Sequence, residues 1–232
     1  MTADDATLDP PGSITIIGAG PLGVEAALYG RFLGYDITLV EAAGIGHSMR
    51  VDYESPLPIM PHECLSPLAV SALQAQNLQW LPRTLPMSYR DWIETALKGI
   101  VAGDLLEGRL RCPLRATKMV TVPVELDEDE DEADAHHSDD DEPIPPDFRI
   151  ELTDVHGQTE TLESEAVIVA IGDAADIPLE FSLPAPYYFR IGASPSGDLG
   201  EDLKRGRGEI VALYASLAGR AALDLYRPRR SE

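Results

Sequence analysis

Gly18-Ala19-Gly20-Pro21-Leu22-Gly23 lies between the apolar run Ile14 to Ile17 and a stretch with helical spacing. A second apolar run, Asp36 to Val40, ends at Glu41, eighteen residues after Gly23. A strand, a tight glycine turn, a helix and a second strand closed by an acid form a βαβ unit whose turn can hold the phosphates of a dinucleotide. We therefore expect an α/β fold built on a parallel sheet.

Each glycine of the turn has a separate physical role. Gly18 permits the tight turn, Gly20 lets the backbone approach a pyrophosphate, and Gly23 lets the helix pack closely on the strand. Pro21 suits the first helical turn, where its missing N–H is no loss. The free N–H groups and partial positive charge of the helix N-terminus would then face the phosphates.

Glu41 stands where an acid can bind the ribose of a dinucleotide. Its carboxylate can accept hydrogen bonds from both ribose hydroxyls. Its negative charge would repel a phosphate on the 2′-hydroxyl. Glu41 therefore favours FAD or NAD over a 2′-phosphorylated ligand.

The composition is that of a globular protein and shows no sign of secretion or membrane insertion. The chain has 232 residues, 44% of them hydrophobic, which is enough for one large domain or two small ones. It has no long unbroken apolar run, and residues 1–12 are acidic rather than leader-like. Cys64 and Cys112 are far apart in sequence, so neither a redox dithiol nor a zinc site is expected. We expect a cytoplasmic protein without a metal or a membrane partner.

Much of the net charge of −22 is concentrated in one segment. Residues 125–142 hold twelve of the forty acids and no Lys or Arg. Like charges repel one another and the segment has little apolar surface to bury, so we expect a disordered acidic insert. His136 and His137 lie within it, but a flexible tract offers no fixed metal geometry. So acidic a surface also argues against a nucleic-acid partner.

The rest of the chain predicts one domain, residues 13–232, after a flexible tail over residues 1–12. Helical spacing dominates before the acidic insert, and alternating or continuous apolar runs dominate after it. The elements expected after the βαβ unit are helices at Leu68–Leu78 and Tyr89–Val101, strands at Ala116–Leu126, Phe148–Leu152, Thr159–Leu162, Ala166–Asp173 and Tyr188–Gly192, and a closing helix at Glu209–Tyr226. The strands around the insert form a β-meander, and Ala166–Asp173 is apolar enough to be buried on both faces of a parallel sheet.

The sequence resembles the flavoproteins with two dinucleotide-binding domains, a group that includes flavin-dependent monooxygenases and thioredoxin-reductase-like enzymes. The likeness begins with the turn from Gly18 to Gly23 and with Glu41. Residues 167–173, VIVAIGD, look like the second FAD fingerprint of that group, and residues 189–193, FRIGA, look like its late strand, which brings a glycine near the flavin. Residues 45–68 look like the segment after the ribose acid in monooxygenase-like members.

This resemblance implies a Rossmann-like FAD/NAD(P)-binding domain with a parallel sheet, a β-meander crossover and a C-terminal helix. FAD is the expected cofactor and NAD the alternative. A protein that binds only a nicotinamide cofactor would share the glycine turn, but it would not ordinarily insert a meander before the VIVAIGD strand.

The chain departs from that group after Asp173. The resemblance implies a second, large domain there that binds NADPH, whereas residues 174–187 alone separate Asp173 from the last strand. No second glycine fingerprint follows a strand in this sequence. An oxidoreductase of this form would take its electrons from a substrate, from a free pyridine nucleotide or from a partner such as a separate reductase.

The expected cofactor-binding residues are Gly18, Ala19, Gly20, Pro21, Leu22, Gly23, Glu41, Arg50, Gly172, Asp173 and Gly192. No catalytic residue is assigned, because a bound flavin carries out the electron chemistry itself. Arg50 could approach a phosphate or be a surface charge, and Asp173 could bind a ribityl chain or be an exposed turn acid. His47 is expected near the pyrophosphate, and Cys64 is expected to be a small buried side chain rather than a nucleophile.

Three functions remain open at this point. The motifs favour an FAD-binding oxidoreductase, monooxygenase-like, acting on an unknown small-molecule substrate. The missing second domain favours a dinucleotide-binding module without catalysis. An NAD(H)-binding protein is favoured if residues 167–173 are an ordinary core strand.

Replacing residues 126–142 by a short turn should leave folding and cofactor binding almost unchanged. The segment has little apolar surface to bury, and the entropy of closing a loop grows only slowly with its length. Thermal unfolding of the shortened protein measures this directly. A cooperative loss of thermal stability would show that the acids are engaged with the folded domain.

Overall fold

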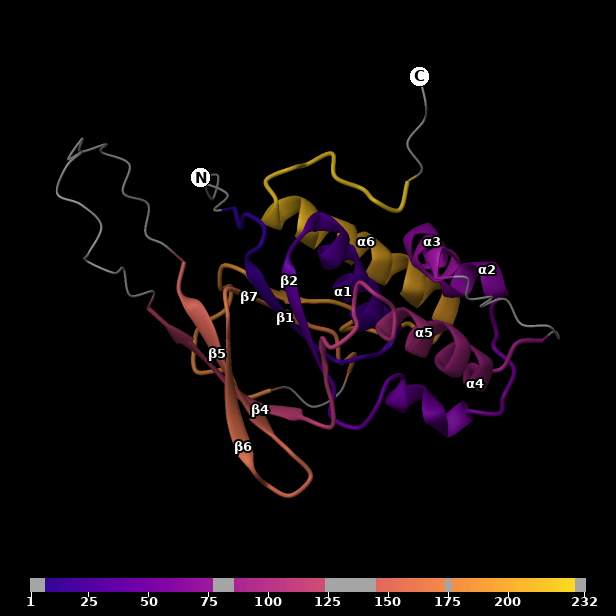
Figure 1. Ribbon diagram of the computed structural model, residues 1–232, viewed down its shortest axis with the longest axis horizontal. Helices are drawn as coiled ribbons and strands as arrows, with labels where there is room; N and C mark the ends of the chain where they lie inside the picture. The colour runs from indigo at the N-terminus through magenta and orange to yellow at the C-terminus, as the bar shows by residue number, and fades with distance from the viewer. Residues whose placement is uncertain (1–6, 77–85, 124–144, 174–176, 228–232) are drawn as a thin grey trace.

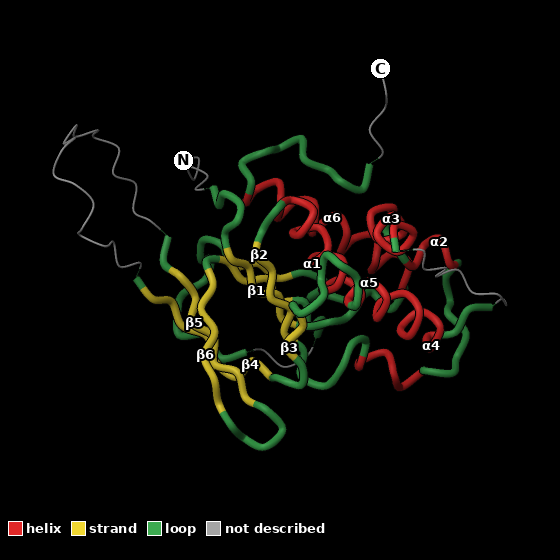
Figure 2. Tube along the Cα trace, in the orientation of Figure 1, coloured by secondary structure: helices red, strands yellow, loops and turns green. Residues whose placement is uncertain are grey.

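The computed structural model describes residues 7–76, 86–123, 145–173 and 177–227 (Figure 1). The acidic insert, residues 125–142, lies outside these ranges, so its expected disorder stays a prediction. In the described ranges, helices cover one face of a parallel sheet and an antiparallel β-meander covers the other (Figure 2). The expected α/β, Rossmann-like architecture is confirmed.

The parallel sheet has five strands in the order β3-β2-β1-β7-β8. They are β1 (Ser13–Ile17), β2 (Asp36–Val40), β3 (Leu110–Arg111), β7 (Ala166–Val169) and β8 (Tyr188–Arg190). Ile14 and Ile16 of β1 pack on the helical side, and Ile17 packs on the meander side. Successive side chains of a strand point to opposite faces, so a strand covered on both sides has no polar face. This accounts for the unbroken apolar runs of the sequence.

The meander lies between β3 and β7, as expected. It consists of β4 (Arg115–Val122), β5 (Asp147–Thr153) and β6 (Thr159–Ser164), all antiparallel. Phe148, Ile150 and Leu152 alternate along β5 and are fully buried, while the residues between them are exposed. These three side chains pack with Val167 of β7, which fastens the meander to the sheet.

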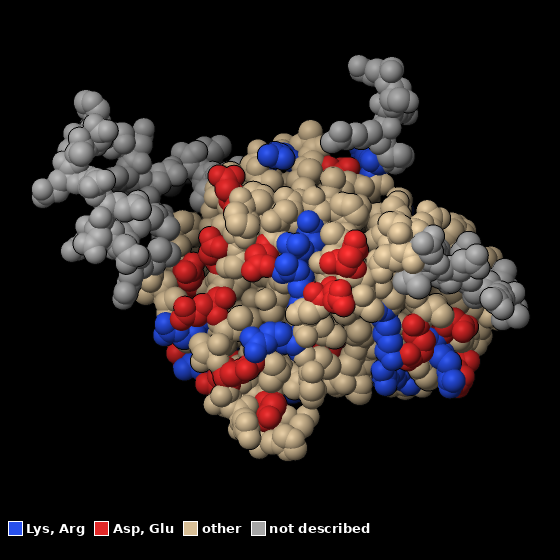
Figure 3. Space-filling model, in the orientation of Figure 1, with Lys and Arg blue, Asp and Glu red and all other residues tan. Residues whose placement is uncertain are grey.

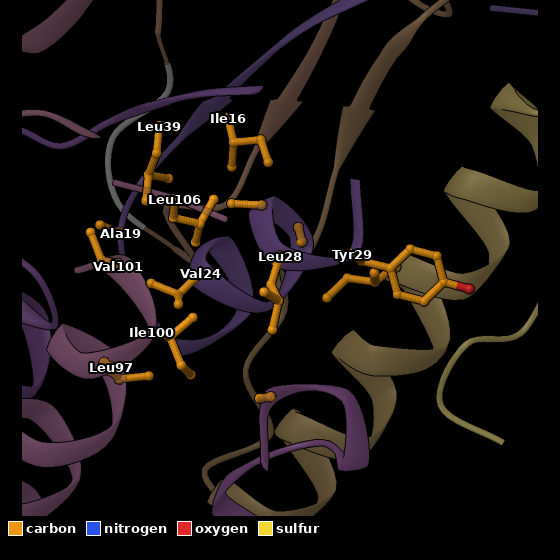
Figure 4. Packing of buried hydrophobic residues seen from close by; sticks show 14 of the residues in the cluster. Ile16, Ala19, Val24, Leu28, Tyr29, Leu39, Leu97, Ile100, Val101 and Leu106 are labelled. Carbon is orange, nitrogen blue, oxygen red and sulfur yellow. The ribbon is translucent and has the colours of Figure 1, made fainter. Parts of the chain in front are cut away.

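The helical side is built on α1 (Pro21–Leu33), whose side chains pack on the sheet. Val24 and Leu28 belong to the same buried cluster as Ile16 and Leu39 of the sheet, and Figure 4 shows these side chains together. The other helical segments are η1 (His47–Asp52), α2 (Pro61–Cys64), α3 (Pro67–Ala75), α4 (Tyr89–Asp91), η2 (Trp92–Leu97), α5 (Lys98–Val101) and α6 (Leu199–Leu217). No helix in the described ranges is both long enough and apolar enough to cross a membrane.

The C-terminal helix is present, but the expected bounds Glu209–Tyr226 are wrong. Helix α6 begins ten residues earlier, at Leu199, where the Asp198 side chain accepts the Glu201 N–H at 3.1 Å. Gly206 lies within this earlier part of the helix, where α6 meets α1. A Cβ on Gly206 would stand 2.3 Å from Leu22 Cδ1. The glycine therefore allows α6 to approach α1 closely.

Residues 7–12 are the described part of the segment over residues 1–12 that was expected to be a flexible tail. They pack against the domain. Leu8 is 6% exposed, and its N–H donates to the Leu217 carbonyl at 2.8 Å. The Tyr35 hydroxyl donates to the Leu8 carbonyl at 2.8 Å. One apolar side chain and two hydrogen bonds thus fasten this segment between α1 and the end of α6.

A buried carboxylate, Glu25 of α1, joins three helices on this side of the sheet. Glu25 is 1% exposed and accepts the Ser66 N–H at 2.7 Å and the Ser66 hydroxyl at 2.5 Å. Ser66 in turn caps α3, and Arg207 Nε of α6 lies 3.7 Å from Glu25 Oε1. Burial raises the pKa of the Glu25 carboxyl, while Arg207 and the Ser66 hydrogen bonds act in the opposite direction. Polar groups at the start of α3 and in α6 surround this carboxylate, and they offset the free-energy cost of burying it.

Glu25→Ala should lower the free energy of unfolding by about 3 to 5 kcal/mol, because it leaves Arg207 and the Ser66 groups buried without their partner. Urea unfolding followed by circular dichroism measures the change. The control is Glu107→Ala, which removes an exposed carboxylate and should change stability by at most about 0.5 kcal/mol. A Glu25 variant as stable as the Glu107 variant would contradict the structural role.

Candidate functional site

A cavity of about 460 Å³ lies at the carboxyl ends of β1, β2 and β7. In this sheet β2 and β7 flank β1 on opposite sides, so the strand order reverses there, and open α/β sheets bind their ligands at such a point. The described residues that line it are Ile17, Gly18, Gly20, Pro21, Leu22, Val40, Glu41, Ala42, Ala43, His47, Ser48, Leu114, Arg115, Ala116, Ala170, Ile171, Gly172, Asp173, Ile177, Ile191, Gly192 and Pro195.

The three glycines of the turn have three different environments. Gly18 has a φ of +106°, and a Cβ there would lie 2.6 Å from the Ala170 carbonyl oxygen. A Cβ at Gly23 would lie 1.9 Å from the Gly18 carbonyl oxygen, whereas a Cβ at Gly20 would meet no atom within 4 Å. Gly18 and Gly23 are therefore required by the fold. Gly20 is not, and its missing side chain leaves open space that a ligand can occupy.

The N-terminus of α1 faces this cavity without a side-chain cap. Gly20 is the N-cap residue, Pro21 occupies the first turn, and the first turn contains no acid. Both Pro21 and Leu22 line the cavity. The free backbone N–H groups and the positive end of the helix dipole are thus available to an anion.

Glu41 connects the glycine turn to the loop after β2. Its Oε2 accepts the Ala19 N–H at 2.8 Å, and its Oε1 accepts the N–H groups of Ala43 at 2.8 Å and Gly44 at 3.3 Å. Each carboxylate oxygen can accept more than one hydrogen bond. The carboxylate therefore orders the backbone on both sides of the cavity, and its expected bonds to ribose hydroxyls stay a prediction.

Two further glycines close the cavity on the side of β7 and β8. Gly172 and Gly192 have φ values of +64° and +65°, and both line the cavity together with Asp173. The Gly192 N–H donates to Glu209 Oε2 of α6 at 2.7 Å. The structure thus brings the end of VIVAIGD, residues 167–173, and the glycine of FRIGA, residues 189–193, to the glycine turn.

Three of the expected cofactor-binding residues do not line the cavity. Ala19 and Gly23 are buried behind it, where they support the turn. Arg50 lies in η1 with its guanidinium carbon 5.8 Å from the Tyr53 ring centroid. An approach of Arg50 to a phosphate stays a prediction.

The sequence reasoning missed the part of the cavity that comes from the start of β4. Leu114, Arg115 and Ala116 line the cavity there. No motif in the sequence marks these residues as part of a binding site, because their pattern is that of the beginning of an ordinary meander strand. His47 lines the cavity as well, and its expected place near the pyrophosphate stays a prediction.

The remaining chemically suggestive residue, Cys64, is buried away from this cavity. It is 1% exposed, and burial raises the pKa of its thiol to about 12. A thiol with so high a pKa is not a nucleophile at neutral pH. The described residues also contain no group of three His, Cys, Asp or Glu side chains that could hold a metal ion.

Gly20→Val should change the free energy of unfolding by less than about 1 kcal/mol, because the new side chain enters open space. Gly23→Ala should lower it by about 1 to 3 kcal/mol or more, because its Cβ would overlap the Gly18 carbonyl. Urea unfolding of the two variants tests this contrast. Equal losses of stability would mean that the turn is not built as described.

This chain was compared with protein-family models, with curated proteins and with solved structures, and matches were found among the solved structures. No protein-family model matches the sequence, and no curated protein matches it. Bacillithiol disulfide reductase from Bacillus cereus is 14% identical, with a TM-score of 0.45 over 69% of this chain and 40% of that one. Ornithine hydroxylase from Pseudomonas aeruginosa is 15% identical, with a TM-score of 0.48 over 72% and 40%. Cyclohexanone monooxygenase is 20% identical, with a TM-score of 0.46 over 75% and 28%.

The chain therefore spans 28 to 40% of the length of these three proteins. Their activities, substrates and partners are properties of longer chains, and this similarity does not assign them to the present one.

Proposed function

We propose that this chain binds FAD at the cavity formed by the glycine turn and Glu41, and that it acts as a flavin-dependent oxidoreductase. The observation that carries the proposal is the contrast between the three glycines. Gly18 and Gly23 are packed against backbone, while the space beside Gly20 is empty and opens on a cavity. A fold alone does not need that open space, but the pyrophosphate of a dinucleotide does.

FAD is favoured over NAD by what surrounds the turn. A meander of three antiparallel strands is inserted between β3 and β7, and it contributes the start of β4 to the cavity wall. Gly172 and Gly192 add a wall on the opposite side. This arrangement agrees with the resemblance to two-domain flavoproteins, in which a meander and a late glycine accompany the flavin.

The residues of this chain would bind and orient the cofactor. The N-terminus of α1 would hold the pyrophosphate, and Glu41 would hold the adenosine ribose. His47, Ser48, Gly192 and Pro195 also line the cavity and would contact the cofactor there, with His47 near the pyrophosphate. The flavin would supply the electron chemistry once bound, and its substrate would be a small molecule, as in monooxygenase-like enzymes.

A dinucleotide-binding module without catalysis is the second candidate. Strand β7 ends at Val169 and β8 begins at Tyr188, and the sequence between them contains no further glycine fingerprint. This stretch of sequence thus contains no second glycine turn of the kind that would hold NADPH against the flavin. If it is an oxidoreductase, a separate reductase or another electron donor would supply its electrons.

The absorbance spectrum of the purified protein, before and after addition of FAD, tests the assignment. We expect flavin bands at one FAD per chain in the parent, and none in Gly20→Val, because the valine would occupy the volume of the pyrophosphate. Gly208→Val is the matched control, since Gly208 is exposed on α6 and a Cβ there also meets no atom within 4 Å. It should bind FAD like the parent.

Retention of FAD by Gly20→Val at the stoichiometry of the parent would show that the glycine turn is not the phosphate site. A colourless protein that binds NADH but not FAD would favour the nicotinamide alternative. Bound FAD that no electron donor reduces would favour the module without catalysis.

A further inference from the structure

Permanent positive charge is scarce in the cavity. Two acidic residues, Glu41 and Asp173, line it. Arg115 is the only lysine or arginine among the described lining residues. The whole chain carries a net charge of −22. A ligand with a diphosphate would therefore enter a site whose surroundings repel it, unless a local cation offsets that repulsion.

Arg115 differs from the other cations of the meander region because its side chain has no partner in the described part of the chain. Arg111 pairs with Glu160, Lys118 with Glu180 and Arg149 with Glu163, each at 2.8 Å; no ion pair or side-chain hydrogen bond of Arg115 is found among the described residues. On the face drawn in Figure 3, too, basic side chains mostly lie beside acidic ones. Among the described basic residues of the meander region, Arg115 is thus the one without an ion pair.

The backbone holds Arg115 beside the end of β2. Arg115 is the first residue of β4 and pairs with Thr153 of β5. The preceding residue, Leu114, donates its N–H to the Glu41 carbonyl at 2.9 Å. The Glu41 carboxylate is itself engaged by the N–H groups of Ala19, Ala43 and Gly44, and it makes no ion pair with Arg115. The backbone of Arg115 is therefore held beside the Glu41 end of the cavity, while its exposed side chain makes no ion pair among the described residues and keeps its charge free for a ligand.

We propose that Arg115 binds a phosphate oxygen on the adenosine side of the dinucleotide. It would thereby be a specificity-determining residue that favours adenosine ligands carrying a diphosphate over adenosine itself. This inference rests on the proposed function. A guanidinium presents several N–H donors in one plane and can bind phosphate oxygens through two hydrogen bonds at once. Arg115 thus takes the role that the sequence suggested for Arg50, whose guanidinium instead lies over the Tyr53 ring.

Titration calorimetry of the full chain, freed of cofactor, with ADP and with adenosine tests the proposal. Arg115→Gln should weaken ADP binding by roughly three- to fivefold at low salt, the upper part of the range expected for one exposed ion pair. Its effect on adenosine should be less than about twofold, because adenosine has no phosphate. Arg115→Lys should keep most of the ADP affinity, and added salt should reduce the difference between the parent and Arg115→Gln.

Arg149→Gln is the matched control. It removes one positive charge from the neighbouring strand β5, and Arg149 does not line the cavity. A loss of ADP affinity in Arg115→Gln no larger than in Arg149→Gln, or an equal loss for adenosine, would overturn the inference and leave the proposed function standing. Failure of the parent protein to bind ADP and FAD at all would overturn both.

Discussion

The close approach of helix α1 to the end of β1 is the constraint on which the rest of this structure depends. A Cβ at Gly23 would lie 1.9 Å from the Gly18 carbonyl oxygen, and one at Gly18 would lie 2.6 Å from the Ala170 carbonyl oxygen. A strand, a helix and the segment after β7 thus meet at backbone contact. The cavity forms where these three ends converge, and the uncapped helix N-terminus is aimed into it.

A second set of contacts extends this arrangement to the C-terminal part of the chain. A Cβ at Gly192 would lie 2.8 Å from Leu22 Cδ1, and one at Gly206 would lie 2.3 Å from the same atom. The first turn of α1 therefore packs against both Gly192, two residues after β8, and the middle of α6. Glu209 of α6 accepts the Gly192 N–H. The last helix therefore helps to position one wall of a cavity that Gly18 lines on another side.

Local electrostatics and net charge act in opposite directions at this cavity. The chain is strongly acidic, yet the cavity is bordered by the N-terminus of α1 and by Arg115, which has no ion pair among the described residues. The Glu41 carboxylate is surrounded by three backbone N–H groups rather than by a cation. Over a few ångströms such groups outweigh distant charges, which solvent and salt screen. An acidic protein can therefore present a site suited to an anion.

The glycine spacing, the acid after the second strand and the apolar run at residues 167–173 were sufficient to predict the α/β fold, the parallel sheet and the place of the glycine turn. They were sufficient because each reports a local steric or solvent requirement that few other folds impose. The bounds of α6 were not predictable in this way. Gly206 and Gly208 lower helix propensity, and the Asp198 cap and the buried apolar face of α6 offset that cost.

The burial of Leu8, the role of Glu25 and the cavity position of Arg115 were decided by tertiary structure alone. Each depends on residues far away in sequence: Leu8 on Leu217, Glu25 on Ser66 and Arg207, and Arg115 on the meander that sets it beside Glu41. A sequence pattern reports which face of an element is apolar, but it does not report which distant element covers that face or which charge is left without a partner.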